Sequence, residues 1–283
     1  MEKALKKWFL LFAAPTLAAF VVGFIWPFLH GLYLSFCQFT TVEQADFVGI
    51  SNYQQALTDP TFLDSFWFTA AFVIVATFII NLTAFAIAMA LTKELKGTTV
   101  FRTIFFMPNL IGGIVLGYIW QTLINAVLIQ IGEPLLALNT KAGYWGLIIL
   151  LSWQQIGYMM IIYISGLQNI SPELMEAAAI DGANGWQSLW RVKLPLVMPS
   201  ITICLFLTIT NAFKLFDQNL SLTAGEPAHT TEMLALHIYY TFYARAGAVW
   251  KGIGQAKAVV FFMLVVLIGL TQLWATRSKE VQQ

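Results

Sequence analysis

Charged side chains are scarce in this 283-residue sequence: Asp, Glu, Lys and Arg together make up 10% of it, whereas about 25% is usual in soluble domains. This composition argues against a water-soluble fold. The net charge of +1 gives no indication of nucleic-acid binding, and the basic residues lie in short flanks rather than in patches. Cysteine is also scarce: Cys37 and Cys204 lie at or within apolar segments, so no disulfide framework and no metal-ligand spacing follows.

Motifs for enzyme chemistry are absent as well. The three histidines are scattered and form no HExxH pattern. Gly247 and Gly252 have the glycine spacing of a phosphate loop, but Ile253 and Gly254 follow where Lys and Ser or Thr are required. We therefore expect no catalytic residue, no metal site and no cofactor in this chain.

What the sequence has in abundance is long apolar runs, each close to the roughly 20 residues that a spanning helix needs. The predicted fold is an all-α polytopic membrane protein, one domain over residues 1–283 with six transmembrane helices. The spans are expected at about 8–36, 66–92, 104–128, 144–167, 197–217 and 256–276. The first run is too long for a cleaved signal peptide and is interpreted as a helix that stays in the protein.

The distribution of Lys and Arg predicts the orientation, because cytoplasmic flanks are enriched in both. With both termini inside, ten of the fifteen basic residues are cytoplasmic: Lys3, Lys6, Lys7, Lys93, Lys96, Arg102, Arg191, Lys193, Arg277 and Lys279. The outer segments hold Lys141, Lys214, Arg245, Lys251 and Lys257. This orientation puts residues 171–196 in the cytoplasm.

Residues 171–196 carry helix signals but are too short and too polar to span a membrane. The Ser-Pro-Glu beginning at Ser171 is a typical helix start, and Gly182 can end that helix in the left-handed conformation. Asn184 with glutamine three residues later predicts a second helix, ending before Pro195. From these signals alone, the segment is either an amphipathic connector on lipid headgroups or a helix–turn–helix that inserts into a groove of another protein.

The spacing within this segment resembles the EAA loop of ABC importer permeases. Glu-Ala-Ala at 176–178 is followed by Gly182, nine further residues and then Val192-x-Leu194-Pro195, with Val192 where the family usually has isoleucine. The resemblance implies a coupling helix seated in a cytoplasmic ATPase. The residues carried over are Glu176, Ala177, Ala178, Asp181, Gly182, Leu194 and Pro195.

Further motifs are similar to carbohydrate importer permeases, in particular the first of their two permease subunits, the larger maltose type and the glycerol-phosphate type. They are Phe216-Asp217, Leu222-Thr223, Gly225-Glu226-Pro227, Thr230-Thr231, Ile238-Tyr239 and Gly252-Ile253-Gly254-Gln255-Ala256. Glu226 replaces a usual glycine and puts a carboxylate at the outer face. The similarity extends from the first predicted helix to the last.

The resemblance implies a set of partners in a prokaryotic cytoplasmic membrane. They are a second homologous permease subunit, two cytoplasmic ATPase subunits that bind ATP and Mg, an extracellular or periplasmic solute-binding protein, a sugar and membrane lipid. The binding protein is expected to dock on the outer segments 38–64 and 219–254.

Polar groups at membrane depth are costly and usually face a cavity or another helix. Pro108 and the nearby glycines predict a flexible or broken start of the third span. Asn211, Lys214, Asp217 and Gln218 recur at three- and four-residue steps, which places them on one face of a fifth helix. Both substrate contact and helix-bridging hydrogen bonds suit such residues, and Lys214 and Asp217 could simply neutralise each other.

By resemblance to maltose-type permeases, sugar contacts fall near Asn109, Trp153, Gly157, Met160, Asn211 and Leu215. Together with the intramembrane polar groups, the predicted substrate path comprises Asn109, Trp153, Gln154, Gly157, Tyr158, Met160, Asn211, Lys214, Leu215 and Asp217. The predicted function is half of the translocation path of an ATP-driven, binding-protein-dependent importer of sugars. The alternatives are an importer of glycerol phosphate or another small polar solute, a secondary transporter driven by an ion gradient, and a non-transporting scaffold.

Overall fold

The computed structural model describes residues 2–93 and 97–277, and the chain in it is almost entirely helical. The α-helices are α1 (Glu2–Phe20), α2 (Trp26–Leu34), α3 (Ser51–Thr58), α4 (Pro60–Leu91), α5 (Thr98–Phe106), α6 (Gly113–Ile131), α7 (Thr140–Gln168), α8 (Pro172–Ile180), α9 (Gly185–Ser188), α10 (Leu194–Leu196), α11 (Met198–Phe213), α12 (Asp217–Leu222), α13 (Leu234–Tyr239) and α14 (Ala248–Arg277). The π-helices are η1 (Val21–Ile25), η4 (Leu189–Lys193) and η5 (Tyr240–Ala244), and the 3-10 turns are η2 (Met107–Leu110) and η3 (Leu136–Leu138). A short antiparallel hairpin joins β1 (Cys37–Thr41) to β2 (Gln44–Phe47), with Cys37 opposite Phe47.

Within residues 2–93 and 97–277, five helical stretches are long and apolar enough to cross a membrane: Phe12–Leu34, Pro60–Leu91, Gly113–Ile131, Thr140–Gln168 and Ala248–Thr276. A sixth results if Gly185–Leu196 and Met198–Phe213, which meet at a bend of 70°, are counted as one broken span. These stretches overlap the six predicted spans, and the all-α membrane fold is confirmed.

The predicted orientation is not tested by the fold and stays a prediction. Lys96 and Lys279, which contribute to it, lie outside the described residues, as do the side chains of Lys3, Lys6, Lys7 and Arg277. The prediction of a single domain and its exact membrane boundaries also stays open to test.

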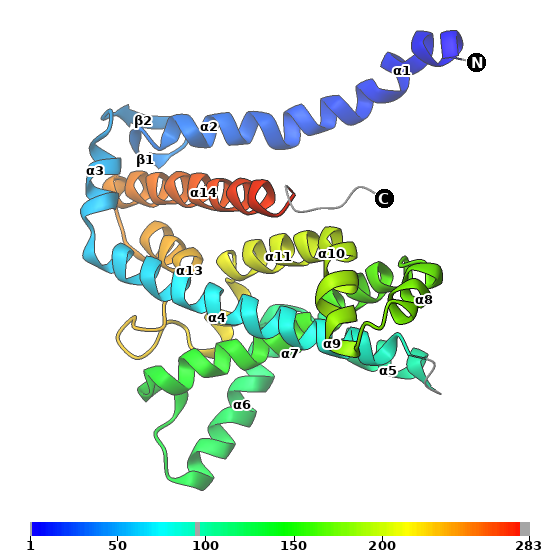
Figure 1. Ribbon diagram of the computed structural model, residues 1–283. Coiled ribbons are helices and arrows are strands. Elements are labelled where there is room, and N and C mark those ends of the chain that lie inside the picture. Colours follow the sequence, from blue (N-terminus) through cyan, green and yellow to red (C-terminus); the bar gives the residue numbers. More distant parts are fainter. Residues whose placement is uncertain (1, 94–96, 278–283) are drawn as a thin grey trace. The chain divides into compact units, whose positions relative to one another are not determined.

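The chain divides into two compact units. The first contains residues 2–62 and Ile238–Phe262. In it α2 and the first half of α14 run side by side (Figure 1), and Gln255 donates a hydrogen bond of 3.0 Å to the carbonyl of Gly31. Asn52, fully buried, donates to the carbonyls of Ser35 and Cys37 and so ties α3 to the hairpin.

Lys257 on α14 is the charged residue at the core of this first unit. Its side chain is fully buried, and its Nζ lies 2.6 Å from Oδ2 of Asp59, at the end of α3. Nζ also lies 3.3 Å from Thr241 Oγ1 and 5.3 Å from the ring centroid of Phe62. A buried ammonium requires such partners, because its transfer out of water is otherwise prohibitive.

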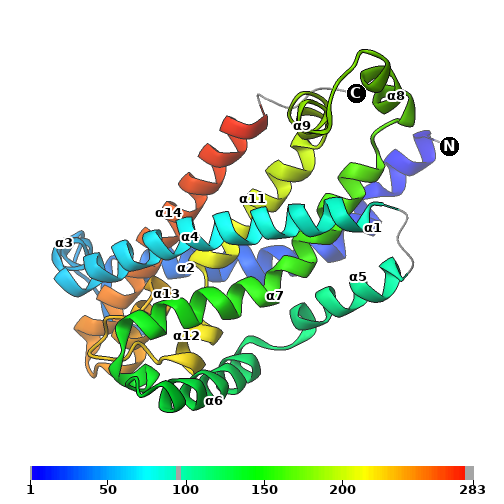
Figure 2. The ribbon, with the colours of Figure 1, turned by 60° about the horizontal axis from the view of Figure 1, so that its bottom comes forward.

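The second unit, residues 63–237 with 263–277, is built around α7. Two thirds (67%) of the apolar window of this helix is buried inside the structure, with α5 and α11 packed against it, as Figure 2 shows from a second direction. At the centre, Tyr163 donates to Asn81 Oδ1 on α4 (2.7 Å), and Asn81 in turn donates to Thr208 on α11 (3.3 Å). These buried amide and hydroxyl groups bridge three helices, as expected for polar residues at membrane depth.

Candidate functional site

Three regions of the second unit gather the predicted functional residues: a polar pocket, the loop from Thr223 to His237, and the segment 171–196, named here the coupling segment. The pocket has a volume of about 310 Å³. Its lining comes from η2, α7, the end of α11 and the start of α12: Asn109, Gln154, Gln155, Asn211, Lys214, Leu215, Phe216, Asp217 and Gln218.

Two helix breaks create this pocket. The predicted break in the third span is present: α5 ends at Phe106, the 3-10 turn η2 follows, and α6 begins only at Gly113. This turn holds Asn109 at the pocket wall. The second break separates α11, which ends at Phe213, from α12, which begins at Asp217.

The second break corrects one expectation. Asn211, Lys214, Asp217 and Gln218 do line one pocket, but not as a single face of one continuous helix. Among the described residues, Lys214 and Asp217 form no ion pair with each other, so the predicted mutual neutralisation is not seen. Both side chains are exposed at the pocket.

Amide groups organise the pocket interior. Gln218 Nε2 donates to Gln154 Oε1 (2.7 Å), and Gln154 Nε2 donates to the carbonyl of Ile111 (3.1 Å). Gln155 Oε1, by contrast, is buried and accepts no hydrogen bond from any described residue. An unsatisfied buried acceptor is costly, and this oxygen is closed off from solvent although the residue lines the pocket.

The structure places four of the ten predicted path residues outside the pocket lining. Trp153 stacks edge-on against Trp120 at 5.6 Å, and Tyr158 lies 6.4 Å from Phe106. Met160 is fully buried in the core. Gly157 serves close packing, because a Cβ built on it would lie 1.8 Å from the carbonyl oxygen of Phe105.

Three lining residues are absent from the predicted set: Gln155, Phe216 and Gln218. The two glutamines carried a usable signal, since each is an amide within or next to an apolar run. Phe216 carried none, because an aromatic residue beside a span is ordinary.

The coupling segment has two short helices joined by a tight turn. Gly182 has φ = +78°, and the turn closes with a hydrogen bond from Ala183 N to Ala178 O (3.0 Å), as in a Schellman end. Asn184 and Gln187 then form a full capping box, with both hydrogen bonds at 2.9 Å. Both features were predicted.

Two details of this segment differ from prediction. Ser171 occupies the N-cap position, but its side chain makes no capping hydrogen bond. The second helix does not end before Pro195: η4 leads into α10, which continues to Leu196. Pro195 stands in the first turn of α10, where proline is tolerated.

No residue from Ser171 to Leu196 is buried. Ile180 is 87% exposed, and the neighbouring Trp186 and Trp190, 5.5 Å apart, are 68% and 55% exposed. Glu176, Ala177, Asp181 and Gly182 are also exposed, whereas Ala178, Leu194 and Pro195 are half-buried. The segment therefore presents most of the EAA-like residues and four large apolar side chains on its surface: Leu174, Ile180, Trp186 and Trp190.

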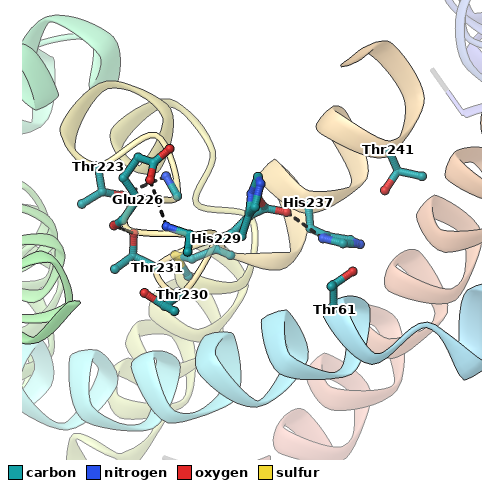
Figure 3. A network of polar contacts seen from close by, with 12 residues as sticks. Thr61, Thr223, Glu226, His229, Thr230, Thr231, His237 and Thr241 are labelled. Atoms are coloured by element: carbon teal, nitrogen blue, oxygen red, sulfur yellow. Dashed lines mark hydrogen bonds and ion pairs between the residues drawn. The ribbon is translucent and has the colours of Figure 1, made fainter. Parts of the chain in front are cut away.

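The loop from Thr223, with the first turn of α13 up to His237, is held by buried polar contacts, of which Figure 3 shows a part. Glu232, 2% exposed, pairs with His237 Nδ1 at 2.6 Å and also with His229. Burial alone would raise the pKa of Glu232, but the hydrogen bonds from the two histidines outweigh it and hold this pKa below its usual range. Asn219 adds hydrogen bonds to Thr231 O (2.8 Å) and from Met233 N (2.9 Å). Glu226 remains exposed at the surface of this rigid loop.

Within the described residues, no group of three or more His, Cys, Asp or Glu side chains could hold a metal ion. The pocket and the coupling segment are the two arrangements with functional character. Neither contains a nucleophile with a paired general base.

Comparison with known proteins gives a consistent result. Residues 83–278 match the family described as "Binding-protein-dependent transport system inner membrane component". The chain is 42% identical over 284 residues to the probable starch degradation products transport system permease protein AmyD of Thermoanaerobacterium thermosulfurigenes, covering 97% of this chain and 96% of the relative. It is 32% identical to the multiple sugar-binding transport system permease protein MsmF of Streptococcus mutans, covering 99% of both.

Among solved structures, a chain of a bacterial ABC transporter involved in the import of the acidic polysaccharide alginate has the same fold. The TM-score is 0.82 at 20% identity, with 98% of both chains covered. At this identity the likeness concerns the fold alone.

Proposed function

Because this chain belongs to the family of binding-protein-dependent transport system inner membrane components, we propose that it is the membrane-spanning permease subunit of an ATP-driven importer of oligosaccharides. The permease assignment accords with relatives that are matched almost from end to end. The substrate class is supported by two of these relatives, whose names refer to starch degradation products and to multiple sugars.

The observation that carries the substrate proposal is the composition of the pocket. Five of its lining residues are amides: Asn109, Gln154, Gln155, Asn211 and Gln218. An amide side chain both donates and accepts hydrogen bonds, which suits the hydroxyl groups of a sugar. Gln155 Oε1 has no donor among the described residues and is closed off from solvent, so it would accept from such a hydroxyl only after its side chain turns toward the pocket.

The charges of the pocket argue against a phosphorylated substrate. Lys214 and Asp217 contribute one positive and one negative charge, so the lining is not strongly basic. Phosphate recognition normally uses several cationic groups or a bidentate arginine. A neutral oligosaccharide fits this wall better than glycerol phosphate.

The energy source is proposed to be a separate ATPase that docks on the coupling segment. The exposed surface around Glu176 and Gly182 supports this proposal, because a protein groove would remove the neighbouring apolar side chain of Ile180 from water. The complete importer then has a second permease subunit, two ATPase subunits that bind ATP and Mg, and a solute-binding protein on the outer side. Nucleotide and binding protein would favour different states of one bistable bundle.

Uptake by cells that carry the intact importer tests the substrate proposal. We expect import of a labelled malto-oligosaccharide and no import of labelled glycerol 3-phosphate. Gln155→Leu should lower uptake at least tenfold, because it removes one of the five amides that line the pocket, whereas Gln130→Leu at an exposed position of α6 should leave it unchanged. Import driven by an ion gradient in vesicles without the ATPase would refute the proposal.

The coupling surface is tested by co-purification. Glu176→Lys should leave the permease in the membrane but reduce the amount of ATPase that purifies with it, because it reverses a charge on the exposed face of α8. Lys141→Gln, at the opposite end of α7, is the matched control. Normal ATPase recovery and normal uptake in the Glu176→Lys variant would contradict the docking proposal.

A further inference from the structure

A second cavity, of about 530 Å³, lies in the same unit as the polar pocket but at the end that carries the coupling segment. It is lined by the end of α4, the end of α7, α8 and η4: Ala86, Met89, Ala90, Thr92, Lys93, Leu167, Ile170, Met175 and Lys193. Its volume falls within the ~300–1,000 Å³ range of small-molecule sites.

The lining of this cavity has an apolar part and a positively charged part. Six of the nine residues are aliphatic or methionine side chains, and the two charged residues are both lysines. Among the described residues, neither Lys93 nor Lys193 forms a salt bridge or a side-chain hydrogen bond. The cavity therefore combines an apolar wall with two cations that lack an anionic partner in the described part of the chain.

The position of the cavity matches the boundary of a membrane. Leu91 ends the apolar stretch of α4, Gln168 ends that of α7, and both stretches are long enough to cross the bilayer. A cavity at these two helix ends lies where hydrocarbon gives way to headgroups. Lysines at that depth attract anionic lipids, and basic pockets between helix ends bind their headgroups.

We propose that this cavity binds one anionic phospholipid, with the phosphate between Lys93 and Lys193 and an acyl chain along Ala86, Ala90 and Leu167. The two small alanines lie one turn apart on α4 and are both exposed, so they leave room for a chain. A neutral phospholipid would fill the apolar part but would gain less from the lysines.

The bound lipid would also contact the coupling segment directly. Met175 belongs to α8 and Lys193 to η4, so a headgroup between the lysines links the coupling segment to the end of α4. Met175 lies in addition 4.0 Å from the hydroxyl of Ser188, which connects α8 to α9. The site is independent of which solute the permease transports.

Lipid retention by the purified importer complex tests this proposal. The complex, with the subunits that assemble on it, is delipidated in detergent and titrated with phosphatidylglycerol or phosphatidylcholine, and bound lipid is counted by native mass spectrometry. We expect the wild type to retain one more phosphatidylglycerol than phosphatidylcholine. The double variant Lys93→Gln/Lys193→Gln should raise the half-saturating phosphatidylglycerol concentration about tenfold or more, given roughly 1 kcal/mol per basic residue at the surface.

Three further variants separate the contributions of the lysine charges and of the apolar wall to lipid binding. Lys93→Arg/Lys193→Arg keeps both charges and should bind as the wild type does. Ala86→Phe keeps both lysines but fills the apolar wall, so it should also weaken binding. Lys141→Gln removes a lysine at the other end of α7 and should change nothing.

Several outcomes would overturn the proposal. Equal retention of the two lipids by the wild type would show that the lysines select no headgroup. Unchanged phosphatidylglycerol binding in the double glutamine variant would show that the site lies elsewhere. Chemical cross-links from Lys93 and Lys193 to another subunit, without lipid selectivity, would identify the cavity as a protein interface.

Discussion

At the scale of single residues, close helix packing depends on a few glycines. α7 passes the end of α5 so closely that a methyl group at Gly157 would overlap the carbonyl of Phe105 at 1.8 Å. A second contact of this kind is Gly117 on α6, where a Cβ would lie 1.8 Å from Ser221 Oγ. Small residues have this role in many membrane bundles, where they let backbones approach.

Gly157→Ala is therefore expected to destabilise the protein, although alanine favours helices. The backbone of α5 has to move, and overpacking of this kind typically costs about 1–3 kcal/mol. The melting temperature in detergent should fall by several degrees. Gly23→Ala, where nothing lies within 4 Å of the new methyl group, is the control and should have no such effect. Equal melting temperatures for both variants would refute the packing role of Gly157.

The buried pair of Asp59 and Lys257 is the second residue-scale feature. Burial alone would raise the pKa of Asp59, but hydrogen bonds from Lys257 and Thr61 outweigh it and lower this pKa from 3.8 to about 2. A depressed carboxyl pKa means that the folded state favours the ionised form. The stabilisation by this pair is therefore complete above about pH 4 and is lost as the pH falls through 2.

Asp59→Asn is expected to cost more stability than the double variant Asp59→Asn/Lys257→Met. The single variant leaves the buried ammonium of Lys257 without the carboxylate of Asp59, which lowers the free energy of unfolding by about 3 kcal/mol. This value is at the low end of the usual range for a buried ion pair, because the Asp59 side chain is 18% exposed. The double variant also removes the positive charge of Lys257, so no unpaired ammonium is left in the core. Thermal unfolding in detergent measures both, and a double variant at least as unstable as the single one would contradict this account.

At the scale of elements, the coupling segment shows how capping sets the geometry of a surface helix pair. Gly182 supplies the left-handed turn, and the Asn184–Gln187 capping box starts the second helix. No described side chain is buried in this segment, so local hydrogen bonds contribute a large share of its stability. This differs from the spans, where tertiary packing dominates.

Asn184→Ala should accordingly loosen residues 185–196, because the loss of a cap costs about 1 kcal/mol. Amide hydrogen exchange in that range should accelerate by roughly fivefold, which corresponds to this loss. Ser171→Ala is the matched comparison, because Ser171 makes no capping hydrogen bond in the structure and its removal should leave the exchange of α8 unchanged. If Ser171→Ala accelerated amide exchange more than Asn184→Ala does, the prediction would be wrong.

At the scale of the whole molecule, the features that depend on local sequence could be predicted, whereas the features that depend on contacts between distant segments could not. The apolar runs located the membrane helices, and the glycine and asparagine signals located the turn and the second cap of the coupling segment. All three depend on local sequence. Trp153, Met160 and Gly157 were assigned to the substrate path by resemblance; they do not line the polar pocket, and their place in the substrate path stays a prediction.

The polar pocket also depends on tertiary structure that the sequence does not reveal. Its residues come from η2, α7, α11 and α12, and the break after Phe213 decides which of them meet. A periodicity of three and four cannot reveal that break, because residues that follow it still satisfy the spacing. Gln155 was likewise visible as a polar residue in an apolar run, but its unpaired oxygen could be recognised only from the packed structure.

The arrangement of the chain across the membrane gives a last prediction, on the orientation inferred from Lys and Arg. Cys37 and Cys204 are buried, so the wild type should react slowly with a membrane-impermeant maleimide in intact cells. Glu226→Cys, exposed on the loop 223–237, should be labelled from outside, because that loop precedes the last span on the predicted outer face. Glu176→Cys, equally exposed on α8, should be labelled only after permeabilisation. The reverse pattern would place the coupling segment outside, where no ATPase could reach it, and would refute both the orientation and the coupling proposal.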